Sequence, residues 1–261
     1  MSWWHAVLLG LLQGVTEFLP VSSSGHLALA QMVVPGFEQP GVVFDAVLHL
    51  GTAMAVVWSE RAELMRWLTT PSGWRLGGLL VLGTLATAMV ALPIKDVAES
   101  AFTRPVWVGV GLLVTATVVA ATRWVGRPGR GEPATRWADA VVVGLVQGLT
   151  VFPGVSRSGS TILAGLGRGL DRRWAARFSF LLSVPAILAA TILQIAGERE
   201  ALVRMGWEFW AACLLGATVA GVSGYLSLRI VLRTLGSEVF HRFAWYCLPL
   251  GIVVVAVGMT R

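Results

Sequence analysis

Charged residues are scarce in this sequence. Asp, Glu, Lys and Arg make up 13% of its 261 residues, whereas an ordinary soluble domain has about 25%. Hydrophobic residues make up 56%, and the mean hydropathy is +0.73. This composition excludes an ordinary soluble domain and indicates a polytopic membrane protein, with room for one large domain or two small ones.

Cysteine is almost as scarce. Cys213 and Cys247 both lie in apolar runs, so we expect small buried side chains that say little about the redox compartment. The N-terminus lacks a basic segment and a small-residue cleavage site, so no cleaved signal peptide is predicted. The net charge of +6 comes from basic residues dispersed among loops, which argues against a nucleic-acid partner and favours loops that face the cytoplasm.

A run of polar side chains interrupts the apolar N-terminal region. Residues 13–26 read Gln-Gly-Val-Thr-Glu-Phe-Leu-Pro-Val-Ser-Ser-Ser-Gly-His. Polar groups embedded in an apolar run are costly in lipid and mark a functional site. A proline and two glycines break the helix here, and non-helical backbone at membrane depth needs surrounding protein or a water-filled cavity. We therefore predict a re-entrant hairpin over residues 3–34, with one half-helix ending near Phe18 and a second beginning near Ser24.

The pattern of the N-terminal region recurs later in the chain. Residues 6–30 align without gaps on residues 140–164, which is more similarity than biased composition produces by chance. The first member of each identical pair is Ala6, Val7, Gly10, Leu11, Gln13, Gly14, Thr16, Phe18, Val21, Ser22, Ser24, Gly25, Leu29 or Ala30.

The repeat predicts two halves, each with a hairpin and three apolar stretches near the length of about 20 residues that crosses a bilayer. The first half is 1–125, with its hairpin at 3–34 and spans at 41–59, 75–93 and 105–123. A basic linker at 126–136 precedes the second half, 137–261, with its hairpin at 137–170 and spans at 176–196, 208–228 and 240–259. Because three spans per half is an odd number, the expected fold is an all-α polytopic membrane protein with an inverted-topology repeat.

The distribution of arginine supports this topology. With the N-terminus outside, the predicted cytoplasmic loops are 60–75, 123–136, 168–177 and 229–242. These loops hold most of the 20 basic residues, and a positive-inside bias favours this orientation. The two hairpins then enter from opposite leaflets, and we expect their broken tips to meet near the midplane.

The second hairpin tip keeps the backbone pattern of the first but changes its charges. It reads Gln-Gly-Leu-Thr-Val-Phe-Pro-Gly-Val-Ser-Arg-Ser-Gly-Ser-Thr over residues 147–161. If the tips meet, one pocket combines an acid, an imidazole, a guanidinium and two half-helix N-termini, which suits a phosphorylated group at membrane depth. Three of the positions that differ between the tips change their charge or chemistry: Glu17 and Val151, Ser23 and Arg157, and His26 and Ser160.

Several of these residues have a structural alternative. Gln13 and Glu17 lie four apart on one helix face and offer oxygen ligands for a divalent cation, whereas packing between helices is the alternative for Gln13 and for Gln147. For Glu17, the structural alternative to a functional role is a salt bridge with Arg157. Capping of the half-helices is the alternative role for Ser22, Ser24, Ser156 and Ser158.

One further polar pair lies in the first predicted span. Asp45 and His49 are four residues apart, so they share a helix face that could reach the pocket. The favoured interpretation of this pair is a structural polar contact.

The two tips resemble those of the bacterial undecaprenyl-diphosphate phosphatase family, often called BacA/UppP. The matching motifs are residues 13–26 and Pro153–Thr161, and the order of spans and residues 44–57 extend the resemblance over essentially the whole chain. Many members have a glutamate where this chain has Gln13, so Glu17 must do more if a metal is bound.

The resemblance implies hydrolysis of undecaprenyl diphosphate to undecaprenyl phosphate and inorganic phosphate, with Mg²⁺ or Ca²⁺ as a divalent cofactor. It also implies a bacterial inner-membrane location, a site open to the outer face, and bacitracin resistance through recycling of the cell-wall lipid carrier. The predicted catalytic residues are Glu17, Ser23, His26 and Arg157. The predicted substrate-binding residues are Ser22, Ser24, Gly25, Gly154, Ser156, Ser158, Gly159 and Thr161. The predicted metal ligands are Glu17 and Gln13.

Two mechanisms and two function classes stay open at this level. Ser23 is the predicted nucleophile with Glu17 or His26 as its base, and direct attack by water is the alternative. Inverted repeats with broken helices are also transporter architecture, so a lipid-phosphate flippase or transporter is the competing class. The predicted partners are the lipid substrate and the bilayer, and a homodimer stays an open alternative.

Overall fold

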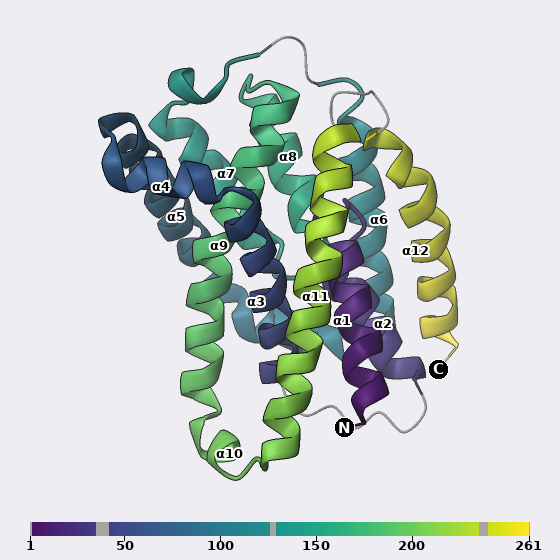
Figure 1. Cartoon of the computed structure of the whole chain (residues 1–261). Helices are drawn as coiled ribbons and strands as arrows, with labels where there is room; N and C mark the ends of the chain where they lie inside the picture. Colours follow the sequence, from purple (N-terminus) through teal and green to yellow (C-terminus); the bar gives the residue numbers. More distant parts are fainter. Residues whose placement is uncertain (1, 35–41, 126–128, 235–239, 261) are drawn as a thin grey trace.

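The computed structural model describes residues 2–34, 42–125, 129–234 and 240–260 (Figure 1). The first residue of the predicted span at 41–59 and the first three of the linker at 126–136 lie outside these ranges, as do both terminal residues. Within these ranges the chain is helical, and its β-structure is limited to an isolated bridge between Arg130 and Leu170.

The helices of the first half begin with the predicted hairpin. They are α1 (Trp3–Phe18), α2 (Ser23–Val33), α3 (Val42–Ser59), α4 (Arg61–Thr69), α5 (Pro71–Phe102) and α6 (Pro105–Ala121). The second half contains η1 (Glu132–Ala134), α7 (Trp137–Leu149), α8 (Arg157–Gly167), α9 (Arg172–Gly197), α10 (Arg199–Val203), α11 (Trp207–Thr234), η2 (Phe240–Phe243) and α12 (Ala244–Met259).

The molecule is an all-α, multi-pass membrane protein by the length and composition of its helices. Among the described residues, four helices are long and apolar enough to cross a membrane: Pro71–Phe102, Arg172–Gly197, Trp207–Arg233 and Phe240–Met259. The other two predicted spans correspond to shorter apolar helices, Val43–Ser59 and Pro105–Ala121.

Some helices differ from the sequence prediction at their ends. The span predicted at 75–93 is part of α5, which begins at Pro71 behind the N-cap Thr70 and continues past Pro93 to Phe102. The predicted span ends where charged residues begin, but the helix continues through them, and Lys95 and Glu99 pair at 3.4 Å, one turn apart. The short helices α4 and α10 were not predicted, because each lies within a loop that has no long apolar run.

The two halves are interlocked. Helix α1 of the first hairpin packs on α11, and helix α7 of the second hairpin packs on α5, so each hairpin lies against the second span of the other half. Corresponding glycines allow both contacts. A Cβ added to Gly10 would lie 2.5 Å from the carbonyl oxygen of Gly216, and one added to Gly144 would lie 2.2 Å from that of Gly83.

The hairpins approach the middle of the bundle from opposite ends (Figure 1). The turn between α1 and α2 is held by the main core, where Phe18 packs edge-to-face on Phe180 with ring centroids 5.4 Å apart. The opposed entry agrees with the arrangement expected for an inverted repeat, and the inversion relative to a bilayer stays a prediction.

Candidate active site

The two hairpin tips meet, as the sequence predicts. The guanidinium Nη2 of Arg157 donates to Oε1 of Glu17 at 2.6 Å, across 140 residues of sequence. The backbones also touch, because a Cβ added to Gly25 would lie 2.8 Å from the Cα of Gly154. Ser158 Oγ donates to the carbonyl of Leu19 at 3.1 Å and ties the second tip to the first turn.

The first tip is shaped by Ser22. Its φ of 68° lies in the left-handed region, which non-glycine residues rarely adopt, and this conformation turns the chain from α1 into α2. Its Oγ accepts from the backbone N–H of Gly25 at 3.2 Å, and Ser24 Oγ lies 3.3 Å from it. Ser22 is therefore a helix cap, which leaves the hydroxyl of Ser23 to face Glu17.

The second tip is built in the same way. Ser156 caps α8 by accepting from the N–H of Gly159 at 3.1 Å, and Ser158 Oγ lies 3.2 Å from its hydroxyl. Gly154 has a φ of +86°, and a Cβ there would lie 2.2 Å from the carbonyl oxygen of Val108. Only glycine suits this position on both grounds.

Two residues that the sequence did not single out hold the second tip. Thr115 of α6 donates to the carbonyl of Gly154 and accepts from the N–H of Ser156, both at 2.7 Å. Ser179 of α9 bonds the hydroxyl of Thr161 at 2.5 Å. Thr161 also donates to the carbonyl of Arg157, so its side chain stabilises α8 and joins it to α9. Neither Thr115 nor Ser179 belongs to a polar motif that sequence could identify.

Glu17 is the centre of the site. Its Oε1 accepts from Arg157, while its Oε2 accepts from Ser23 Oγ at 2.5 Å and from Gln13 Nε2 at 2.7 Å. The side chains of Glu17 and Arg157 are only 3% and 18% exposed, so the ion pair is largely buried. A buried carboxylate of this kind stays charged because an opposite charge and hydrogen bonds compensate for the lost water.

Two polar atoms in the site have no partner. Among the described residues, Arg157 Nη1 and Gln13 Oε1 are buried and make no hydrogen bond. The first atom is a positively charged donor and the second is an acceptor. Both side chains are held beside Glu17, because Arg157 donates to it through Nη2 and Gln13 donates to it through Nε2. Buried polar atoms are rarely left unsatisfied, so these two are available to a ligand.

Gln147 bonds a residue of α5. Its Nε2 donates to Thr87 Oγ1 of α5 at 3.1 Å. This contact agrees with the alternative in which Gln147 packs between helices. Its counterpart in the repeat, Gln13, donates to Glu17 instead.

The ring nitrogens of His26 bond groups other than Ser23 and Glu17. Its Nδ1 lies 2.8 Å from the carbonyl of Ser22, and its Nε2 lies 2.8 Å from the hydroxyl of Tyr246, whose ring stacks on the imidazole at 5.7 Å. Because a carbonyl only accepts, Nδ1 carries the proton and Nε2 accepts from Tyr246. The sequence missed Tyr246, which lies in α12 far from either motif.

His49 is the second imidazole near the site. Its Nε2 lies 3.7 Å from Glu17 Oε2, and its Nδ1 lies 2.8 Å from the carbonyl of Asp45. The carboxylate of Asp45 in turn accepts from Gln31 of α2 at 2.8 and 3.1 Å. The pair thus makes a structural contact, as expected, and also brings His49 to Glu17. The spacing of four residues in an apolar span was the only sequence signal.

The donors for a divalent cation are few. Among the described residues, no group of three or more His, Cys, Asp or Glu side chains is arranged to hold a metal ion. Glu17 supplies a carboxylate and Gln13 an unpartnered amide oxygen. This set fits Mg²⁺ or Ca²⁺ only when most ligands come from water and a substrate phosphate, which is the usual way in which Mg²⁺ is bound.

The arrangement combines the parts needed for attack on a phosphorus atom. A hydroxyl is bonded to a carboxylate, a guanidinium offers a free N–H beside them, and Ser23 and Arg157 are the first residues of α2 and α8. The positive ends of both helix dipoles therefore favour an anion at the same point.

Comparison with known proteins agrees with this chemistry. The family described as Bacitracin resistance protein BacA matches residues 6–253. An undecaprenyl-diphosphatase from Desulfatibacillum aliphaticivorans is 39% identical over 276 residues and covers 98% of each chain. Relatives with the same name from Gemmatimonas aurantiaca and Mycobacterium leprae are 38% and 39% identical, covering 100% and 98% of this chain and 100% and 94% of their own. The motifs at the two tips and the match along nearly all of the sequence show that this chain belongs to the BacA family of bacitracin resistance proteins.

Proposed function

We propose that this protein hydrolyses undecaprenyl diphosphate to undecaprenyl phosphate and inorganic phosphate. The names of the relatives support the substrate and the reaction. The observation that carries the proposal is the contact of one carboxylate, Glu17, with both the hydroxyl of Ser23 and the guanidinium of Arg157. Translocation of a lipid requires no such hydroxyl–carboxylate pair, so the transporter alternative is not favoured.

In the proposed mechanism, Ser23 Oγ attacks the terminal phosphorus and Glu17 accepts its proton. The bond from that phosphorus to the bridging oxygen breaks, and undecaprenyl phosphate leaves with the electron pair. Glu17 returns the proton to the leaving group and then accepts one from the water that attacks the phosphoserine. The bond from phosphorus to Ser23 Oγ breaks, inorganic phosphate leaves, and Glu17 gives its proton back to Ser23 Oγ. His26 is not assigned the base role, because both of its nitrogens have other partners.

Arg157 binds the phosphoryl oxygens in this scheme. Nη1 is the donor without a partner, and Nη2 is held by Glu17. The N-terminal amides of α2 and α8 add further donors. Gly25 and Gly154 have no side chain, so the backbones of the two tips can come into contact. Ser22 and Ser156 cap α2 and α8.

A divalent cation would be held by Glu17, by Gln13 Oε1 and by the diphosphate itself. It would neutralise charge that develops on the phosphoryl group. We expect chelation with EDTA to lower phosphate release by purified protein, and added Mg²⁺ or Ca²⁺ to restore it. Full activity in the presence of chelator would contradict the cation requirement.

The proposed location is the bacterial inner membrane, with the site open to the outer face. The bias of arginine toward the loops at 60–75, 123–136, 168–177 and 229–242 supports this orientation.

Ser23→Ala tests the reaction and its covalent route. We expect phosphate release from undecaprenyl diphosphate in detergent to fall by about 10³-fold or more, because no hydroxyl remains to form the phosphoenzyme. Ser100→Ala, at an exposed position of α5, is the matched control and should retain activity. Near-normal turnover of Ser23→Ala would exclude the covalent route in favour of water attack. Absence of phosphate release by folded wild-type protein would exclude the hydrolase.

A further inference from the structure

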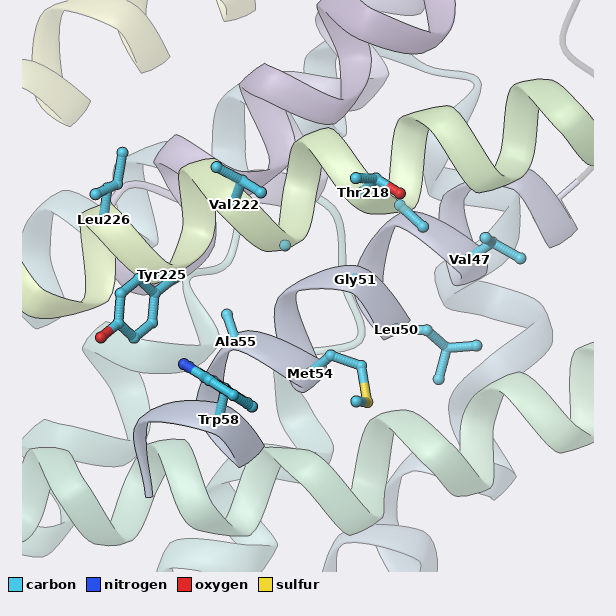
Figure 2. A pocket seen from close by; sticks show the side chains of 12 residues that line it. Val47, Leu50, Gly51, Met54, Ala55, Trp58, Thr218, Val222, Tyr225 and Leu226 are labelled. Carbon is cyan, nitrogen blue, oxygen red and sulfur yellow. The ribbon is translucent and has the colours of Figure 1, made fainter. Parts of the chain in front are cut away.

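An apolar groove lies between α3 and α11 (Figure 2), and the lining side chains Met54, Val222 and Leu226 are exposed. Its volume is about 630 Å³. The lining residues labelled in Figure 2 follow both helices from Val47 and Thr218 at one end to Trp58 and Tyr225 at the other. Glu17 and His49 of the polar site are not among its lining residues.

The groove exists because small residues form its floor. Gly51 and Ala55 of α3 face Ala217 and Gly221 of α11, with four-residue spacing on each helix. A Cβ added to Gly51 would lie 2.2 Å from the carbonyl oxygen of Ala217, so the helix backbones are in contact there. Larger side chains stand on either side and make the walls, among them Met54, Val222 and Leu226.

Two arginines lie at the aromatic end of the groove. The guanidinium carbon of Arg61 lies 5.0 Å from the ring centroid of Trp58, and that of Arg229 lies 5.6 Å from the ring of Tyr225. Arg61 Nη1 also donates to the carbonyl of Trp58 at 2.8 Å, and Arg229 Nη1 lies 3.1 Å from the hydroxyl of Tyr225. Both guanidiniums are therefore held against rings that line the groove.

The charge of these arginines is not neutralised by the neighbouring acids. In the described part of the chain, Glu60 pairs with Arg177, and Glu63 pairs with Arg66 and Arg177. Neither Arg61 nor Arg229 has a carboxylate partner there, and both are exposed. The groove thus joins an apolar channel to two uncompensated positive charges.

We propose that this groove binds an anionic phospholipid, with acyl chain along α3 and α11 and the phosphate headgroup at Arg61 and Arg229. Both arginines belong to loops predicted to face the cytoplasm, where the leaflet is anionic. The occupant is a lipid rather than a second copy of the chain, because the arginines of two copies would repel each other. A twofold axis along the membrane normal would place the same arginines of two copies at the same level, where they repel.

The headgroup is tested with purified full-length protein by native mass spectrometry. Dioleoylphosphatidylglycerol and dioleoylphosphatidylcholine are titrated separately, and the wild type should prefer the anionic lipid. Arg61→Gln and Arg229→Gln should each weaken phosphatidylglycerol binding about fivefold, with little change for phosphatidylcholine. Arg123→Gln is the matched control, because Arg123 makes the same kind of contact with Trp124, at 5.2 Å, outside the groove.

The channel is tested separately by filling it. Val222→Trp should weaken binding of phosphatidylglycerol, whereas Leu214→Trp, at a similarly exposed position of α11 outside the groove, should not. Unchanged lipid preference in the arginine variants, or equal binding by both tryptophan variants, would overturn the proposal. A dimer that Val222→Trp dissociates would assign the groove to a second copy instead. Retained phosphate release shows that each variant is folded, since none of these residues lies in the catalytic site.

Discussion

At the scale of single residues, Glu17 decides what the site can do. It accepts hydrogen bonds from Ser23, Gln13 and Arg157 and has His49 at 3.7 Å. One of its oxygens faces the guanidinium and the other faces the hydroxyl. The carboxylate can therefore take a proton from Ser23 while it holds Arg157 in place.

Arg157 contributes geometry as well as charge. Arg157→Lys keeps the positive charge beside Glu17 but removes the planar fork and the N–H at Nη1. We expect kcat/KM for phosphate release to fall by about 10²-fold, as for loss of one transition-state donor. Arg173→Lys, at an exposed position near the start of α9, is the control and should retain activity. Wild-type activity of Arg157→Lys would contradict the role of the Nη1 donor in binding the phosphoryl group.

At the scale of elements, the two turns use the same devices. Each has a serine cap whose hydroxyl accepts from a glycine three residues later, at 3.2 Å from Gly25 and 3.1 Å from Gly159. The two turns reverse the chain differently, because the first uses the left-handed conformation of Ser22 and the second that of Gly154. Helix α6 then holds the second turn through Thr115.

Thr115→Val tests this support. Valine has nearly the same shape but leaves the Gly154 carbonyl and the Ser156 N–H without partners in a buried place. We expect a loss of about 1–3 kcal/mol in the free energy of unfolding and reduced phosphate release, since Arg157 follows Ser156 directly. Thr117→Val, on the exposed face of α6, should change stability by less than about 0.5 kcal/mol. Thermal unfolding in detergent measures both, and equal melting temperatures would contradict the role of Thr115.

At the scale of the whole molecule, a buried carboxylate ties the linker to the second hairpin at the end where the arginine-rich loops lie. Asp139, which is fully buried at the start of α7, accepts from Arg130 Nη1 at 2.7 Å and from Arg168 Nε at 3.0 Å. Arg130 belongs to the linker, and Arg168 follows α8 directly. One carboxylate therefore ties the linker to both helices of the second hairpin, and so fixes the hairpin that carries Arg157.

Asp139→Asn should be strongly destabilising. The change leaves two guanidiniums without their buried counter-charge, and breaking a buried pair costs about 3–5 kcal/mol, with the partial exposure of both arginines favouring the lower value. Glu99→Gln, which removes the exposed pair with Lys95, should cost less than about 1 kcal/mol. Chemical unfolding of the purified protein compares the two. Similar stability of both variants would show that Asp139 is not the link described here.

The sequence by itself determined the helical membrane class, the two tips and the family. These follow from local properties: apolar runs predict helices, proline and glycine break them, and the repeated motif identifies both breaks. Glu17, Ser23 and Arg157 could be named because each is a polar residue where lipid disfavours one.

Only the tertiary structure decided which of those residues touch. It paired Ser23 with Glu17, turned His26 toward Tyr246, and brought Thr115 and His49 to the tips from separate spans. The physical reason is that a hydrogen bond depends on positions within about 3 Å and on direction. Helix packing sets those positions through contacts between residues far apart in the chain, and no local pattern records them.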